Sequence, residues 1–334
     1  MMKKQIRKAM ICTIAMMVAA IVSLTGVTYA WFSQSDFATV SDMEIAVESR
    51  DGGVYISTKP YEDFGTTIDI PVPKDAKGDN VKFNPASTAG TLTSDGKLKF
   101  FNGSLESPTD DTMSIEAIAA PGAYYIEQEV YFDNSTGSGD LIISLKDTVI
   151  ASTNENRAIQ AATRVAVVTH GSLTKEQFDV KKLTGEAYPL GTPTVQILET
   201  NPTEHTSLGI SEYKILTGKT SVGANETFAY YYGVNDVTAE GVEINRYNKK
   251  VNSGDPDISQ LTKLSHNADK TATILRATPD DVEIIVPAYS YLKTIVYIWI
   301  EGQDPDCQNN VSGTPYVASI RFTKKGMITN EVGA

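Results

Sequence analysis

The stretch that decides the fold is Tyr124–Leu145, YYIEQEVYFDNSTGSGDLIISL. Its first half, to Phe132, alternates apolar residues with glutamates, as in a strand with one buried face. A cluster of turn-forming residues, Asp133–Gly139, follows it and leads into the apolar run Leu141–Leu145. Two such runs joined by a turn cluster predict a β-hairpin.

A second run, Thr294–Ile300, is apolar on both faces, with aliphatic residues on one and Tyr297 and Trp299 on the other. Such a strand is usually central in its sheet and covered on both sides. Further runs that favour strands are Val54–Ser57, Lys97–Phe101, Arg164–Thr169, Thr194–Leu198, Phe228–Tyr232, Val282–Val286 and Val317–Phe322.

Many short strand-like runs separated by Gly, Asn, Asp and Pro favour an all-β fold over alternating strands and helices. We therefore predict a jelly-roll-like β-sandwich with polar insertions and a few short helices. A capping box at Thr174 predicts one short helix, and the run 156–168 fits a helix or a strand equally well. The polar range 172–265 is interpreted as an elaboration, either loops or a small inserted subdomain.

The N-terminus has the layout of a secretory signal peptide. Four basic residues precede Ala9, and the stretch from Ala9 to Thr28 is uncharged. Thr28 and Ala30 then supply small residues at the −3 and −1 positions of a cleavage site, so the processed chain would begin at Trp31. The predicted organisation is a signal peptide over 1–30, an N-terminal segment over 31–53 and a β-sandwich domain over 54–334.

An uncleaved anchor is the main alternative, because the uncharged stretch could just span a bilayer. Polar and small residues such as Thr13, Ser23 and Gly26 dilute it, which favours cleavage. A lipoprotein signal is disfavoured because Cys12 lies inside the apolar stretch without small residues before it.

The junction Thr28–Ser33, TYAWFS, and the Ser-, Thr- and Asp-rich run after it resemble the TasA and camelysin group of Gram-positive surface proteins. The resemblance covers residues 20–47 and is weak over the rest of the chain, which is longer than the family's body. It implies cleavage by a signal peptidase of the SipW type. It also implies an extracellular β-sandwich that polymerises into matrix fibres by lending a strand to its neighbour.

The charge of the chain excludes some classes of partner. Removing the four basic residues of the signal leaves 25 Lys plus Arg against 41 Asp plus Glu, a net charge of −16. Nucleic acid and anionic lipid surfaces are therefore not expected partners, since both require accumulated cations. Cleavage also leaves Cys307 as the one cysteine, which excludes a disulfide within the chain and leaves crosslinking between subunits as a minor alternative.

Motifs of enzymes are incomplete in this sequence. Gly218-Lys219-Thr220 ends like a phosphate-binding loop, but Tyr213 stands where its first glycine is required. The three histidines are far apart, without a second ligand at zinc spacing, and no Gly-x-Ser-x-Gly elbow is present. We expect no enzymatic activity and no cofactor.

The segment Glu301–Asn310 is the most distinctive run in the body of the chain. Glu301, Asp304 and Asp306 are oxygen ligands dense enough for calcium, but the spacing departs from that of a calcium loop. Asp-Pro-Asp is also ordinary turn chemistry, which we favour over a metal site. Tyr230–Tyr232 and Trp299 could stack on sugar rings, although packing between strands is the more common use of such residues.

The segment Phe37–Glu48 follows the predicted cleavage point closely. Its alternate residues Met43, Ile45 and Val47 would form one apolar face of an extended strand. Such a strand near a free terminus can be lent to another subunit's open sheet edge, with Phe37 and these three residues making the contacts. The alternative is an ordinary first strand of its own sheet; the residues alone favour it, and the family resemblance favours donation.

The sequence thus predicts a secreted, non-enzymatic subunit that assembles with itself into fibres at the cell surface or in a biofilm matrix. It would meet a signal peptidase during export and have no membrane contact after cleavage. The alternative function is a monomeric secreted carbohydrate- or ligand-binding β-sandwich module. A third hypothesis is a hydrolase whose active site is assembled from residues of distant strands.

Overall fold

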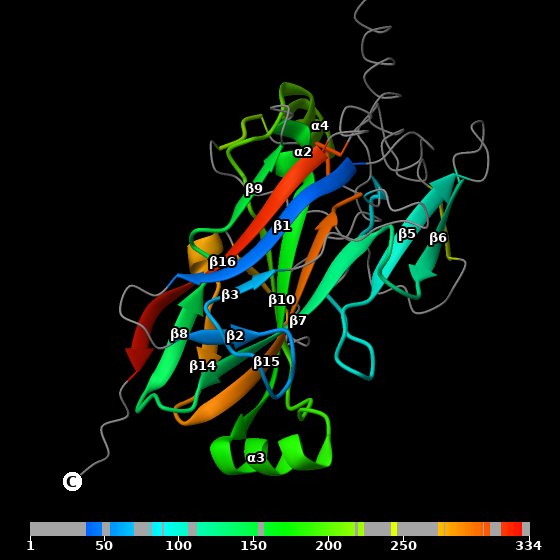
Figure 1. Ribbon diagram of the computed structural model, residues 1–334. Helices are drawn as coiled ribbons and strands as arrows, with labels where there is room; N and C mark the ends of the chain where they lie inside the picture. The colour runs from blue at the N-terminus through cyan, green and yellow to red at the C-terminus, as the bar shows by residue number, and fades with distance from the viewer. Residues whose placement is uncertain are drawn as a thin grey trace, which may run out of the picture.

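The computed structural model describes residues 38–48, 54–69, 80, 82–88, 90–105, 112–152, 157–217, 220–223, 242–245, 273–276, 278–302, 304–307 and 315–328. Strands are the predominant secondary structure of these residues, and most of the strands build two facing sheets, with short helices at the ends (Figure 1). The prediction of an all-β sandwich is confirmed, while the jelly-roll connectivity stays a prediction.

Sheet A has the strand order β14 (Ile284–Val286), β8 (Asp140–Ser144), β16 (Pro315–Ile328), β1 (Ala38–Glu48) and β3 (Thr67–Asp69). Two short strands add to this order: β4 (Lys82–Phe83) pairs with β1, and β9 (Val149–Ser152) pairs with β16. The first and last strands of the described chain, β1 and β16, are parallel, whereas the other pairs in this sheet are antiparallel.

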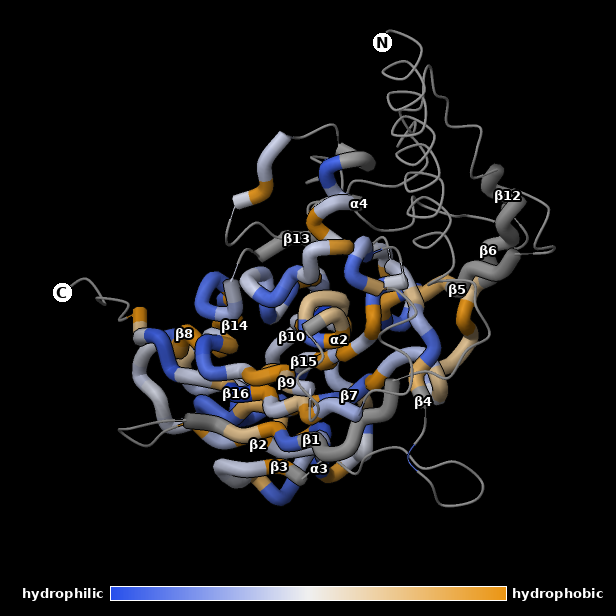
Figure 2. Tube along the Cα trace, turned by 90° about the horizontal axis from the view of Figure 1, so that it is seen from above, coloured by the Kyte–Doolittle hydropathy of each residue, from blue (hydrophilic) through white to orange (hydrophobic). Residues whose placement is uncertain are grey.

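Sheet B has the order β13 (Thr273–Arg276), β11 (Thr194–Glu199), β10 (Thr163–Thr174), β15 (Ser290–Ile300), β7 (Tyr125–Asn134) and β2 (Tyr55–Ser57). A small third sheet joins β12 (Val242–Asn245), β6 (Thr112–Ile118) and β5 (Phe100–Leu105). β5 lies at the side of the molecule away from β8 and β14 (Figure 1; Figure 2).

The helical elements are short. Among the described residues they are α2 (Arg157–Ala162), α3 (Lys175–Thr184), α4 (Ser207–Thr217) and a 3₁₀ turn, η2 (Pro279–Asp281). The capping box predicted at Thr174 is present, since its side chain accepts from the Gln177 N–H and the Gln177 side chain accepts from the Thr174 N–H. The ambiguous run 156–168 contains both structures, because α2 ends at Ala162 and β10 begins at Thr163.

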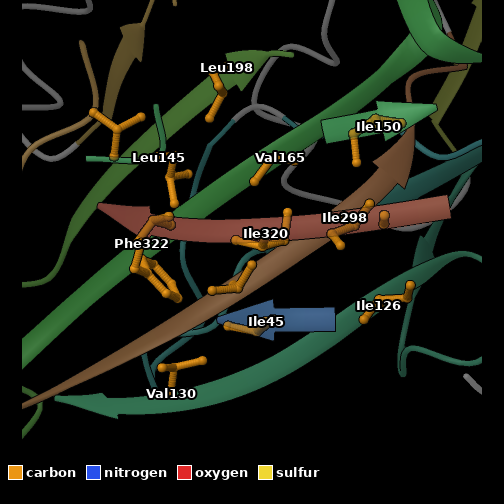
Figure 3. Close-up of a cluster of buried hydrophobic side chains, with 14 of the residues drawn as sticks. Ile45, Ile126, Val130, Leu145, Ile150, Val165, Leu198, Ile298, Ile320 and Phe322 are labelled. Atoms are coloured by element: carbon orange, nitrogen blue, oxygen red, sulfur yellow. The ribbon is translucent and has the colours of Figure 1, made fainter. Parts of the chain in front are cut away.

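The main hydrophobic core lies between sheets A and B. Alternate residues of β16, from Tyr316 to Phe322, face alternate residues of β7 and β15 across it. The hydropathy colouring shows apolar segments distributed along both sheets (Figure 2). The close-up shows Ile45 of β1 in the same cluster as Val130 and Ile320 (Figure 3).

The run Thr294–Ile300 lies in β15, at the centre of sheet B, as predicted. β10 and β7 flank it on either side, and its aliphatic face belongs to the main core. Its other face is covered by a second cluster, in which Phe100 stacks on Tyr125 at 4.1 Å and meets Trp299 edge-on at 5.3 Å. Trp299 is 1% exposed, so it offers no platform for a sugar.

The hairpin predicted over Tyr124–Leu145 is wrong, because β7 belongs to sheet B and β8 to sheet A. The turn between them crosses the sandwich instead of reversing within one sheet. Asn134 holds this crossing, since its side-chain amide donates to the carbonyls of Gly139, Val286 and Pro287, each at 3.0 Å. Both strands still bury their apolar residues, but they do so from opposite sides of the core.

The predicted domain boundaries differ from the structure in two places. β1, within the predicted N-terminal segment 31–53, is a strand of sheet A. β11, within the range 172–265, is a strand of sheet B, so that range is not one separate insertion. Both corrections have the same cause. Whether a strand joins a sheet depends on a partner strand that is distant in the sequence, and the composition around the strand does not reveal that partner.

Candidate functional site

The first candidate site is β1 together with the strands that hold it, and the second is a buried cluster of charges beyond the end of β15. Both contain residues that the sequence singled out. The cleavage junction, with Thr28, Ala30 and Trp31, lies outside the described residues, and so do Phe37 and Tyr230–Tyr232. Among the described helices none is long and apolar enough to span a membrane.

β1 is paired on both of its edges within its own chain. It runs parallel to β16, from Thr39 opposite Pro315 to Glu48 opposite Thr323, with a break in register between Val40 and Asp42. On the other edge, residues 44–46 pair with β3 and residues 38–39 with β4. The ordinary-strand alternative is therefore the arrangement seen in this chain, and strand donation requires that β1 first leave it.

One face of β1 contributes to the main core. Ile45 is 1% exposed and lies opposite Ile320 of β16. The backbone register places Met43 opposite Ala318 and Val47 opposite Phe322, in the same alternating set as Ile45. The predicted apolar face is thus directed into the core between the sheets at Ile45, and a substitute for β1 must present an apolar residue at this position.

The other face of β1 carries an ion pair with β16. Arg321 Nη2 donates to Glu44 Oε2 at 2.8 Å, and Arg321 Nε donates to Ser319 Oγ at 3.1 Å. The Arg321 backbone N–H donates to Thr148 Oγ1 at 3.1 Å. Both charged side chains are half-buried. Arg321 is therefore held by its own strand and its neighbour in a position that meets an acidic residue of β1.

The second site, the charge cluster, is defined by Arg164, Glu199, His205, Glu301, Asp304 and Asp306. These side chains come from the start of β10, the end of β11, the segment before α4 and the segment after β15. All of them are almost fully buried. Burying this many charges is unfavourable unless each finds a partner, so the pairing within the cluster decides whether it stabilises the fold.

Arg164 occupies the centre of the charge cluster. Its Nη2 donates to Asp304 Oδ2 and lies 3.6 Å from Glu199 Oε2, while its Nη1 donates to the Ala161 carbonyl at 2.6 Å. Burial alone would lower the pKa of Arg164, but the Glu199 and Asp304 carboxylates raise it above its ordinary value. Burial raises the pKa of Asp304 to about 7, against the opposing effect of Arg164.

His205 lies between two carboxylates. Its Nδ1 is 2.7 Å from Asp306 Oδ2, and its Nε2 is 3.3 Å from Glu199 Oε1. Burial alone would lower the pKa of His205, but the hydrogen bond with Asp306 and the charge of Glu199 raise it to about 9. The ring is therefore a cation at neutral pH, and it links the end of β11 to the segment after β15.

Asp306 also fixes the beginning of α4. Its Oδ1 accepts from the Thr206 N–H at 2.8 Å and from Thr206 Oγ1 at 2.7 Å, and Thr206 Oγ1 accepts from the Gly209 N–H. A Cβ at Gly209 would lie 2.1 Å from Asp306 Oδ1, so the carboxylate approaches the helix where only glycine leaves room. The charge cluster thereby attaches α4 to the end of sheet B.

The three predicted calcium ligands have separate partners in the structure. Asp304 is paired with Arg164 and Asp306 with His205, while Glu301 accepts from Trp299 Nε1 at 3.2 Å. In the described part of the chain, no group of three or more His, Cys, Asp or Glu side chains is arranged to hold a metal ion. Hydrogen bonds characteristic of turns are present instead, from Asp304 N to the Glu301 carbonyl and from Asp306 N to Asp304 Oδ1.

Sequence reasoning did not find Arg164, Glu199 and His205, which lie far from Asp304 along the chain. Two features of the sequence could have pointed to these residues. Glu199 and Glu301 each follow directly on a strand predicted to be apolar, and Arg164 interrupts the apolar run that continues to Val168. A charge at the end of a buried strand needs a partner, but the partner's identity comes from the fold.

Cys307 is 2% exposed, and burial raises the pKa of its thiol well above the ordinary value. A thiol in this position cannot reach another subunit while the chain is folded. The structure therefore gives no support to crosslinking through Cys307.

No protein-family model matches this chain, and no curated protein or solved structure is significantly similar to it.

Proposed function

We propose that the processed chain is a secreted, non-enzymatic structural subunit that assembles with copies of itself into fibres at the cell surface or in a biofilm matrix. In this proposal each subunit exchanges β1: the strand leaves its own sheet and occupies the same position in a neighbour. The observation that carries the proposal is the place of β1, a strand close to the predicted processed N-terminus that completes sheet A beside the last strand.

The energetics of exchange support this use of β1. A neighbour's β1 would make the same backbone pairs with β16 and β3 and bury the same Ile45, so the closed and exchanged forms have similar contact energy. Each open groove in an opened subunit is a template for another copy, because its backbone groups are unpaired. A chain of such exchanges is an open-ended fibre, whereas the closed chain is a monomer.

The segments around β1 in sequence suit an exchange. Before it, the processed chain would contain only Trp31–Phe37, so the strand has a nearly free end. After it, Ser49–Gly53 supplies two consecutive glycines that can act as a hinge between the closed and exchanged positions. Short hinges beside a terminal strand are the usual sites of domain swapping.

A covalent lock on β1 tests the proposal. Asp42 and Val317 are register partners on β1 and β16. The variant Asp42→Cys with Val317→Cys should therefore form a disulfide that keeps β1 paired with β16 of its own chain. The matched control is Ala151→Cys with Val317→Cys, which crosslinks β9 to β16 and leaves β1 free. Both variants would be prepared as the chain starting at Trp31 and followed by size-exclusion chromatography and negative-stain microscopy.

We expect the reduced lock variant to form filaments and the oxidised one to remain monomeric. The control should form filaments in both states. Filaments from the fully oxidised lock variant would rule out exchange of β1. An unmodified processed chain that stays monomeric at every concentration would instead favour the ligand-binding alternative. That alternative has lost Trp299 as an exposed aromatic, because the side chain is buried in the second cluster.

A further inference from the structure

The ion pair on the outer face of β1 bears on which strand can occupy its position. Any strand with alternating apolar residues could take the place of β1 beside β16, since the described core contact of β1 is made by Ile45, an apolar side chain. Apolar alternation is common in β proteins and distinguishes poorly between one strand and another. Selection of the correct strand therefore requires a contact outside the core.

We propose that Arg321 is the selectivity residue for the place of β1: it admits a strand that carries an acidic residue at the position of Glu44, and so directs exchange toward a second copy of this chain. This inference rests on the proposed function. Arg321 is suited to the role because Ser319 Oγ accepts from its Nε and Thr148 Oγ1 from its backbone N–H, while its Nη2 reaches Glu44 Oε2 at 2.8 Å across the strand pair.

The register of β1 shows how the contact discriminates. Arg321 lies opposite Ala46 and reaches back to Glu44, two residues earlier. A slip of two residues that moved Ala46 into the place of Glu44 would keep the apolar face buried and bring Glu48 directly opposite Arg321. Arg321 would then have to pair straight across instead of with the carboxylate two residues back that it contacts in this structure. The opposite slip would bring Asp42 to Arg321, and the break in register between Val40 and Asp42 opposes that movement by fixing the strand's position.

The exposure of the Arg321 and Glu44 side chains sets the expected size of the selectivity. Both side chains are half-buried, so the ion pair itself contributes little to the stability of the chain. Selectivity against a strand with a basic residue at the position of Glu44 is larger than this stability, because attraction is then replaced by repulsion between like charges. We expect a discrimination of about fivefold for a single mismatched contact.

Charge reversal with sorting tests the inference. The variants are Glu44→Arg, Arg321→Glu and the double swap, each made in the processed chain. The matched control is the swap Lys325→Glu with Glu283→Lys, which reverses a similarly exposed ion pair between β16 and the segment preceding β14. Differently labelled subunits would be mixed, assembled and scored by two-colour microscopy for the fraction of mixed filaments.

Each single reversal loses the ion pair in the closed and the exchanged form alike, so it should open β1 about fivefold more often and shorten the lag of assembly, and the double swap should restore the original lag. Mixtures of unmodified and double-swap subunits should form about fivefold fewer mixed filaments than mixtures with the control swap. Equal mixing in both cases would overturn the role of Arg321 while leaving β1 exchange intact.

If the unmodified chain forms no filaments, the proposed function fails, and the inference is then decided on the monomer. Hydrogen exchange of the β1 amides should be about fivefold faster in Arg321→Glu and should return to normal in the double swap. Unchanged exchange in Arg321→Glu would show that Arg321 does not hold β1.

Discussion

His205 is the residue whose charge state the fold controls most directly. Burial opposes its charge, yet Asp306 and Glu199 raise its pKa to about 9, against about 6.5 in an unfolded chain. The folded state therefore binds this proton more tightly than the unfolded state. The resulting stabilisation is complete below about pH 6.5 and is lost as the pH rises through about 9.

We predict that the free energy of unfolding falls by about 1–3 kcal/mol between pH 7 and pH 10 because of His205 alone. His205→Gln should remove this part of the pH dependence, measured by urea unfolding at each pH. His170→Gln is the control, because burial lowers the pKa of His170 and its effect has the opposite sign. The His170 contribution is present above about pH 6.5 and is lost as the pH falls below it. An identical alkaline slope in His205→Gln and the unmodified chain would contradict the prediction.

At the scale of elements, the crossing between β7 and β8 decides how the two sheets are joined. Asn134 is 5% exposed, and its amide donates to a carbonyl of its own turn and to the carbonyls of Val286, the last residue of β14, and Pro287. The Tyr289 N–H donates to the Gly137 carbonyl, and the Ala288 N–H donates to Asp140 Oδ1. The two connections that pass from one sheet to the other, one after β7 and one before β15, are thus hydrogen-bonded to each other.

We predict that Asn134→Asp lowers the free energy of unfolding by about 2–4 kcal/mol, because a carboxylate would face buried carbonyls without a hydrogen to donate. The control is Ser138→Asp, an exposed position in the same turn, which should change stability by less than about 0.5 kcal/mol. Urea denaturation of both variants gives the comparison. An equal loss of unfolding free energy in Asn134→Asp and Ser138→Asp would mean that the added charge in the turn is responsible, and not the loss of the hydrogen bonds of Asn134.

The same crossing shows what sequence can and cannot predict about the elements. The strands around Tyr124–Phe132 and Leu141–Leu145 and the capping box at Thr174 follow from local periodicity and local hydrogen bonding. The hairpin failed because Asp133–Gly139 is long enough to cross the roughly 10 Å between sheets as well as to turn within one. Which partner β8 finds depends on β16, far along the chain.

The candidate sites, too, could be predicted from the sequence only in part. The alternation at Met43, Ile45 and Val47 predicted a strand with one buried face, and at Ile45 the structure has it. Arg321 could not be predicted as the partner of Glu44, because the contact depends on the parallel pairing of two strands at opposite ends of the sequence. For the charge cluster, local reasoning gave the turn at Asp304–Asp306 but not the cations that neutralise it.

At the scale of the whole molecule, the proposed exchange would begin from a closed chain in which β1 is hydrogen-bonded on both edges. Opening this strand exposes Ile45 and part of the core, so the opened form is rare and assembly should be slow. We predict that urea well below the unfolding midpoint shortens the lag of fibre formation, measured by light scattering, because it increases the population of the opened form.

The oxidised Asp42→Cys, Val317→Cys variant provides the control for this prediction, since its β1 cannot open and urea should leave it monomeric. An assembly rate that only falls as urea is added to the unmodified chain would show that assembly uses the closed subunit. Contacts between closed surfaces would then replace strand exchange as the basis of the fibre.

The parallel pairing of β1 with β16 also has a consequence for biosynthesis. The ribosome makes β1 long before β16, so sheet A lacks the parallel neighbour of β1 until β16 has been made. If the chain is secreted as proposed, through a channel that accepts only unfolded polypeptide, sheet A cannot be completed until β16 has passed through that channel. The topology would then postpone completion of the sandwich until after β16 is translocated.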